Sequence, residues 1–290
     1  MRKRRTAALD SETGCLFLVG TPIGNLEDIT FRALRILKDV DLIACEDTRQ
    51  TQKLLRHYGL SKRLVSYHEH NEFTRAPELI IELEQGAKVA LVSDAGMPVI
   101  SDPGHRLVNL CVRHHIPVVP VPGPSALVAA LAASGLPTEE FLFLGFLPAR
   151  AGERRKALRV LAAESRTIVF YEAPHRIEET LADASEILGA RPAVIAREVT
   201  KLHEEFLRGH LPELLDYVRK KPARGEITLV VGPGAPGMAA PADTNLSLTD
   251  QVAQIMRDQS MDHKAALKQA ARERGLNKRD AYKQLLVERR

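Results

Sequence analysis

The chain has 290 residues, of which 44% are hydrophobic and 27% are charged, and these values indicate a globular protein of about two domains. Its three cysteines lie far apart and form neither a paired-cysteine metal motif nor a disulfide framework, so a reducing compartment suits them best. No apolar run approaches the ~18–20 residues that cross a bilayer, and no apolar segment follows the basic residues 2–5 as in a signal peptide. We therefore expect a cytoplasmic protein rather than a membrane-embedded, secreted or disordered one.

The net charge of +4 is distributed unevenly along the chain. Residues 2–5 are all basic, and residues 245–290 contain ten lysines and arginines against six acids. The rest of the chain therefore carries a small net negative charge. Basic ends favour contact with a polyanion such as nucleic acid, although a solvated tail has the same composition.

Short apolar runs alternate with helical patterns over residues 14–135, which we interpret as one α/β domain. The apolar runs predict strands, and helices lie between them, among them 48–58 and 72–84; the predicted strands are 15–19, 41–45, 64–67, 89–92 and 117–121. Continuous apolar strands separated by helices are typical of a parallel sheet that is covered on both faces. The predicted fold class is therefore α/β, with a parallel-rich first sheet.

The pattern changes near Gly135, and we interpret residues 136–232 as a second α/β domain with a more mixed sheet. The strands predicted there are 141–146, 167–171, 193–197 and 227–231, with helices at about 152–163, 174–188 and 211–219.

The two ends of the chain differ from these domains. We expect residues 1–13 to be a basic, flexible segment, and residues 233–246 are rich in glycine and proline, as in a linker. Residues 247–290 contain three short helical patterns, 248–257, 263–274 and 278–287. The last two are joined at Gly275 with a spacing compatible with a helix-turn-helix-like unit. We predict a small C-terminal helical domain that binds RNA.

Three loops rich in glycine and proline each follow a predicted strand, at residues 20–24, 93–98 and 122–126. In an open α/β sheet, ligands bind beyond the carboxyl ends of the strands, where such loops gather. Glycine lets the backbone approach a ligand closely, and a helix N-terminus offers free N–H groups. One such loop alone is an ordinary turn, whereas three at one edge favour a binding site. None contains GxGxxG or GxxxxGK[ST], which disfavours a dinucleotide or NTP phosphate cradle.

Polar side chains follow the second and third predicted strands, at residues 46–49 and 67–72, where they can form a polar pocket. Asp47 and Asn71 are equally suited to cap the helices that follow, and Asp94 can accept hydrogen bonds from a ribose or an amine or cap a turn. The histidines of this region have no cysteine partner and contain a single HxH, so we expect no metal site.

Nine segments occur together in an order that resembles the tetrapyrrole methylase superfamily and, within it, the enzymes that methylate small-subunit ribosomal RNA. The resemblance covers residues 15–232 densely and the C-terminal helices more loosely. The segments are LVGTPIGNL (18–26), EDTR (46–49), HEHNE (68–72), SDAGMP (93–98), SDPG (101–104), PGPSA (122–126), GFLP (145–148), FYEAPHR (170–176) and GE (225–226).

The resemblance implies a two-domain, homodimeric methyltransferase that binds S-adenosylmethionine in the cleft between its domains. It implies 2′-O-methylation of a cytidine in the decoding centre, helix 44 of 16S rRNA, on the 30S subunit. It also implies the cofactor contacts, which are Pro22, Ile23, Asp94, Gly96, Met97, Ser125 and Ala126, with Tyr171 and Thr228 from the second domain. Met97 stands where many relatives have threonine, which leaves a backbone contact unaffected.

A ribose hydroxyl is a weak acid, so a general base or a cation near the oxygen should assist methyl transfer. Our hypothesis is that Asp47 or His68 is the base and that Arg49 is the partner of a phosphate or of the forming alkoxide. Basic groups that hold RNA phosphates give affinity without sequence information. The basic residues expected to contact RNA are Arg49, Lys264, Lys268, Lys278 and Arg279, and Asn71 is expected to contact RNA at the polar pocket.

Two other functions remain as alternatives. One is a methylase of small tetrapyrroles, because a fold does not determine its substrate; the basic C-terminal helices argue against it. The other is a non-catalytic RNA-binding or assembly protein, and the dense match of the cofactor loops argues against that.

Overall fold

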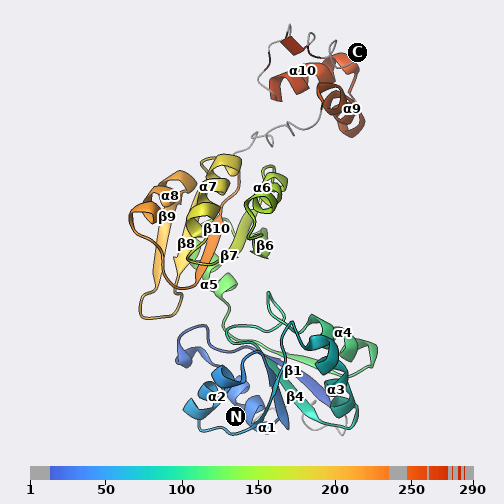
Figure 1. Cartoon of the computed structure of the whole chain (residues 1–290), viewed down its shortest axis with the longest axis vertical. Coiled ribbons are helices and arrows are strands. Elements are labelled where there is room, and N and C mark those ends of the chain that lie inside the picture. The colour runs from blue at the N-terminus through green and yellow to red at the C-terminus, as the bar shows by residue number, and fades with distance from the viewer. Residues whose placement is uncertain are drawn as a thin grey trace. The chain divides into compact units, whose positions relative to one another are not determined.

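The computed structural model describes residues 14–234, 247–259 and 261–273, together with residues 276, 280, 281 and 284 (Figure 1). Residues 1–13 and 235–246, which contain the predicted basic N-terminus and most of the predicted linker, lie outside the described residues. The chain forms two compact units. One contains the described residues up to 135 together with 196–206 and 225–228, and the other contains the remainder.

The first unit contains a five-stranded parallel sheet in the order β3-β2-β4-β1-β5, as the apolar runs predict. Every predicted strand is present, with bounds that differ from the prediction by at most one residue. The strands are β1 (Cys15–Val19), β2 (Leu42–Cys45), β3 (Arg63–Ser66), β4 (Lys88–Val92) and β5 (Val118–Val121).

Helices cover both faces of this sheet, with α1 and α2 on one face and α3 and α4 on the other (Figure 1). Side chains alternate between faces along each strand, so Phe17 packs towards α1 and α2 while Leu16 packs towards α3 and α4. Burial of such side chains stabilises the fold by about 1.5–3 kcal/mol each. The helices are α1 (Phe31–Asp39), α2 (Thr48–His57), α3 (Glu72–Glu84), α4 (His105–Arg113) and α5 (Ala126–Ser134).

The second sheet, most of which lies in the second unit, is a mixed five-stranded sheet in the order β6-β7-β10-β8-β9. Four of its strands were predicted, and the fifth, β9, was missed because it is a half-exposed edge strand whose sequence, EFLRGH, lacks an apolar run. The strands are β6 (Phe141–Phe146), β7 (Thr167–Glu172), β8 (Pro192–Arg197), β9 (Glu205–His210) and β10 (Ile227–Val231), and the helices are α6 (Ala151–Val160), α7 (Ile177–Leu188) and α8 (Leu211–Lys220).

Two helices follow the undescribed segment, α9 (Leu248–Gln259) and α10 (His263–Glu273). They share a small apolar core that includes Val252 and Leu267. Most of the third predicted helix, 278–287, lies outside the described residues. Among the helices of the described residues, none combines the length and the apolar character that crossing a bilayer requires.

Candidate functional site

The carboxyl ends of all five strands of the first sheet meet at one edge, because the strands are parallel. This is the edge at which open α/β sheets bind ligands. Two kinds of loop emerge there. Glycine-containing loops follow β1, β4 and β5, and loops with acidic and histidine side chains follow β2 and β3.

The loops after β1 and β4 are bound to each other through their backbones. Thr21 donates its N–H to the carbonyl of Gly96 (2.9 Å), and Gly96 returns the same kind of bond to Thr21 (3.1 Å). The Thr21 hydroxyl also donates to the carbonyl of Ser93 at 3.1 Å. Two loops separated by more than 70 residues in sequence are therefore joined by hydrogen bonds into one structure.

The loop after β5 joins this structure by close approach of two glycines. A Cβ atom on Gly20 would lie 2.7 Å from the Cα of Gly123, and a Cβ on Gly123 would lie 2.8 Å from the Cα of Gly20. Gly96 has a φ of +83°, and a Cβ there would lie 3.4 Å from the Ile23 side chain. Glycine is thus required at Gly20 and Gly123 by space and at Gly96 by conformation.

The three loops bring together the predicted cofactor contacts of the first unit. Pro22 and Ile23 are buried, and Asp94 is exposed. Ser125 caps α5, accepting a hydrogen bond from the N–H of Val128 at 3.5 Å. The remaining predicted contacts on these loops are Gly96, Met97 and Ala126.

The two predicted contacts of the second sheet lie on β7 and β10. The Tyr171 ring packs against Phe143, with ring centroids 5.0 Å apart, and against Phe146 at 5.8 Å. Thr228 is 3% exposed.

Asp47 and Arg49 form a closed pair at the end of β2. Asp47 caps α2, as one interpretation of the sequence proposed, and accepts a hydrogen bond from the N–H of Arg49 at 2.8 Å. The guanidinium of Arg49 donates to both oxygens of the same carboxylate, at 3.1 and 2.7 Å. These hydrogen bonds lower the pKa of Asp47 to about 2. The N–H of Asp47 also donates to Asp94 (3.1 Å), which links the loops after β2 and β4.

Asn71 holds the loop after β3. Its side-chain oxygen accepts from the N–H of His68 at 2.9 Å, and its amide nitrogen donates to the carbonyl and hydroxyl oxygens of Ser66, both at 3.2 Å. Asn71 occupies the N-cap position of α3, but its side chain makes no capping bond there. His68 Nε2 lies 3.3 Å from the Asn71 amide nitrogen, and within the described structure His68 Nδ1 is buried without a hydrogen-bond partner.

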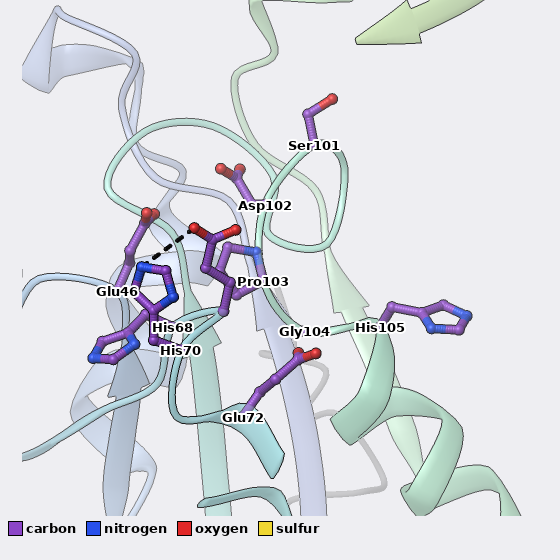
Figure 2. A pocket seen from close by; sticks show the side chains of 10 residues that line it. Glu46, His68, His70, Glu72, Ser101, Asp102, Pro103, Gly104 and His105 are labelled. Atoms are coloured by element: carbon purple, nitrogen blue, oxygen red, sulfur yellow. Dashed lines mark ion pairs between the residues drawn. The ribbon is translucent and has the colours of Figure 1, made fainter. Parts of the chain in front are cut away.

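A cavity of about 520 Å³ opens beside these loops (Figure 2). This volume lies within the range of small-molecule sites. Its lining within the described residues contains four carboxylic acids and three histidines, but no lysine or arginine. The lining residues are Glu46, His68, Glu69, His70, Glu72, Ser101, Asp102, Pro103, Gly104 and His105. Across the part of the chain that the structure describes, no three His, Cys, Asp or Glu side chains are grouped as a metal site requires.

Three carboxyl groups at this edge have raised pKa values, in contrast to Asp47. Burial, followed by the negative charge of Glu46, raises the pKa of Asp102 to about 6. Burial and the charge of Asp94 raise the pKa of Glu46, and burial raises the pKa of Asp94. Sequence reasoning did not single out Asp102, although its Asp-Pro-Gly turn follows a strand and precedes α4.

The predicted RNA contacts lie in different parts of the chain. Arg49 is 85% exposed at the sheet edge. Lys264 and Lys268 are exposed and one helical turn apart on α10, while Lys278 and Arg279 lie outside the described residues.

Comparisons with known proteins show what the chain is similar to. The family model described as Tetrapyrrole (Corrin/Porphyrin) Methylases matches residues 15–215. A protein of Halalkalibacterium halodurans is 48% identical over 97% of this chain and 98% of its own length. A protein of Escherichia coli O157:H7 is 44% identical over 99% of each chain. Both relatives are named ribosomal RNA small subunit methyltransferase I.

Solved structures share the fold at lower sequence identity. Cobalt precorrin-4 methyltransferase is 18% identical with a TM-score of 0.57, and the match covers 80% of this chain and 98% of that one. Uroporphyrin-III C-methyltransferase from Thermus thermophilus, in a complex with S-adenosylhomocysteine, is 22% identical with a TM-score of 0.54, covering 76% of this chain and 97% of that one.

Proposed function

Because the chain belongs to the tetrapyrrole methylase family, and within it to the ribosomal RNA small subunit methyltransferase I group, we propose that it methylates the ribose 2′-oxygen of one cytidine in helix 44 of 16S rRNA. The chain is an S-adenosylmethionine-dependent rRNA methyltransferase. The proposed 2′-O-methylation of a helix 44 cytidine is supported by the similarity to curated rRNA methyltransferases over nearly the whole chain, including the C-terminal helices. We further propose that the substrate is the 30S subunit and that the enzyme acts as a homodimer in the cytoplasm.

The glycine loops fit S-adenosylmethionine. The absence of side chains at Gly20 and Gly123 lets the backbones of these loops approach each other closely, and the Asp94 carboxylate suits a ribose hydroxyl or an amine. S-adenosylmethionine supplies an electrophilic methyl group on a sulfonium sulfur, so the protein mainly orients the acceptor and sets its electrostatic surroundings. The residues proposed to hold it are Pro22, Ile23, Asp94, Gly96, Met97, Ser125 and Ala126, with Tyr171 and Thr228.

The polar loops are proposed to hold the RNA. The Arg49 guanidinium has five N–H donors, and two of them bond Asp47. Because the side chain is exposed, the remaining donors are available to a phosphate of the RNA. Asp47 fixes the position of Arg49, while His68 and Asn71 border the ribose site beside the cavity. Lys264, Lys268, Lys278 and Arg279 are proposed to bind phosphates farther along the RNA.

A transfer assay with alternative acceptors tests this function. The enzyme receives S-adenosylmethionine labelled in the methyl group, together with 30S subunits from cells that lack the enzyme, naked 16S rRNA, or a uroporphyrinogen. We expect label in RNA and none in the tetrapyrrole. Label in the tetrapyrrole alone would establish the small-molecule alternative, and cofactor binding without transfer to any acceptor would contradict the proposed activity.

A further inference from the structure

The loop from Ser93 to Gly104 reaches both the glycine loops and the cavity. Its first part contains Gly96, which is bonded to Thr21, and its second part lines the cavity through residues 101–105. Val99 and Ser101 have positive φ angles of 77° and 62°. A β-branched residue such as Val99 is strained at a positive φ, so the surrounding structure must hold the loop in this conformation. The loop thereby carries Asp102 from β4 to the cavity.

The two base candidates that the sequence indicates have their acceptor atoms engaged or covered. Both oxygens of Asp47 accept hydrogen bonds from Arg49. His68 Nε2 faces the Asn71 amide, and its Nδ1 is buried. Asp102 lies in the wall of the same cavity as His68, which is large enough for a nucleoside, and Figure 2 shows the Asp102 carboxyl group above Pro103.

We propose that Asp102 is the general base that removes the proton of the ribose 2′-hydroxyl. The inference deepens the proposed function and rests on it. The ribose oxygen forms a bond to the methyl carbon while the bond from that carbon to sulfur breaks and its electron pair stays on sulfur. The hydroxyl proton passes to a carboxylate oxygen of Asp102 and is later released to water, so charge and atoms balance.

The charged groups around Asp102 make this role reasonable. Acids and histidines line the same cavity from several elements: Glu46 after β2, His68, Glu69 and His70 after β3, Glu72 on α3 and His105 on α4. Asp94 lies on the same loop as Asp102, and its charge also raises the pKa of Asp102. Burial and Glu46 keep the pKa of Asp102 near 6, whereas a hydrogen bond with Ser93 acts in the opposite direction. A carboxylate whose pKa lies near the working pH is a stronger base than an ordinary one and is still ionised at neutral pH.

The first test compares Asp102→Asn with the wild-type enzyme across pH, using 30S subunits and S-adenosylmethionine. The wild-type turnover should rise with pH through about 6. The variant should lose about 10²–10⁴-fold in turnover, as for removal of a general base, while binding S-adenosylmethionine normally. Asp216→Asn, an exposed aspartate on α8, is the matched control and should retain the wild-type profile. Wild-type turnover in Asp102→Asn would overturn the proposal.

The second test does not depend on methyl transfer. Carbon-13 NMR of carboxyl groups in the protein without cofactor should show one resonance that titrates near pH 6 and is missing in Asp102→Asn. Glu46→Gln should move this titration, and the acid limb of turnover, to lower pH because it removes a negative neighbour. A titration of Asp102 near the ordinary value overturns the inference even if Asp102→Asn does not fold. Absence of RNA methylation by the wild-type enzyme would instead contradict the proposed function and leave this titration measurable.

Discussion

Arg49 and Asp47 show how one ion pair can prepare a residue for a substrate. The carboxylate caps α2 and fixes the guanidinium, yet the arginine side chain is 85% exposed. An isolated surface pair contributes little to stability. Here the ion pair holds the Arg49 guanidinium at the sheet edge where the proposed RNA site lies.

Replacing Arg49 should therefore weaken RNA binding more than it weakens the fold. Arg49→Ala is expected to raise the KM for 30S subunits and to reduce the slope of log affinity against log salt by about 0.7–0.9, the loss of one phosphate contact. Cofactor affinity should stay at the wild-type value in calorimetry. Arg63→Ala removes an exposed arginine at the opposite end of β3 and is the control. Equal salt slopes for both variants would argue against a phosphate at Arg49.

The raised pKa of Asp102 also predicts that the stability of the folded protein depends on pH. A raised pKa means that the folded state binds a proton that the unfolded chain has already released between about pH 3.8 and pH 6. Stability from this group therefore falls as pH rises through that window, and the cost persists above it. Asp102→Asn should melt at a higher temperature than the wild type at about pH 8, with the difference shrinking towards pH 4. A variant that is less stable at both pH values would contradict the raised pKa.

At the scale of elements, the loops at the sheet edge require close backbone contact between Gly20 and Gly123. Gly20→Ala places a Cβ 2.7 Å from Gly123 and 2.8 Å from the Met97 sulfur, so the loops after β1 and β5 must separate. Overpacking of this kind costs about 1–3 kcal/mol. We expect a lower melting temperature and a clear loss of S-adenosylmethionine affinity by calorimetry.

The matched control for that variant is Gly152→Ala. Gly152 lies in α6, where nothing lies within 4 Å of a new Cβ, and alanine is the better helix former. This variant should keep cofactor affinity and match or exceed wild-type stability. If Gly20→Ala bound the cofactor with wild-type affinity, the close contact between Gly20 and Gly123 would not be part of the cofactor site.

Local pattern predicted the elements of this fold well because the core strands are buried on both faces. Ile43, Ala90 and Val230, for example, lie in uninterrupted apolar runs. The pattern failed at β9, which is a polar edge strand held by its neighbours rather than by its own apolar character. The local pattern also could not predict which residues distant in sequence lie close together in the fold. The engagement of Asp47 by Arg49 is local, whereas the raised pKa of Asp102 depends on burial in the fold and on the charge of Glu46, which follows a different strand.

At the scale of the whole molecule, the exposed lysines of α10 and the acidic cavity belong to different units of the chain. Lys264 and Lys268 are exposed on α10, and the cavity wall among the described residues has no lysine or arginine. We propose that the C-terminal helices bind phosphates and that the chemistry takes place at the first sheet, in keeping with an RNA substrate much larger than the cavity.

A double variant tests this division of roles. Lys264→Ala combined with Lys268→Ala should lower 30S affinity, with a salt slope smaller by about 1.4–1.8, because two phosphate contacts are lost. Cofactor affinity and turnover at saturating 30S should be retained. Lys156→Ala combined with Lys220→Ala, two exposed lysines on α6 and α8, is the control. Reduced turnover at saturation would place these lysines in the chemical step instead.

The most direct test of the account is to locate the transferred methyl group. Subunits from cells that lack the enzyme are treated with the protein and labelled S-adenosylmethionine, and the RNA is mapped at nucleotide resolution together with its resistance to alkaline cleavage. We predict label at a single cytidine of helix 44, with the adjacent phosphodiester resistant to alkali. Label on a base, or at a nucleotide outside the decoding centre, would contradict the proposed 2′-O-methylation.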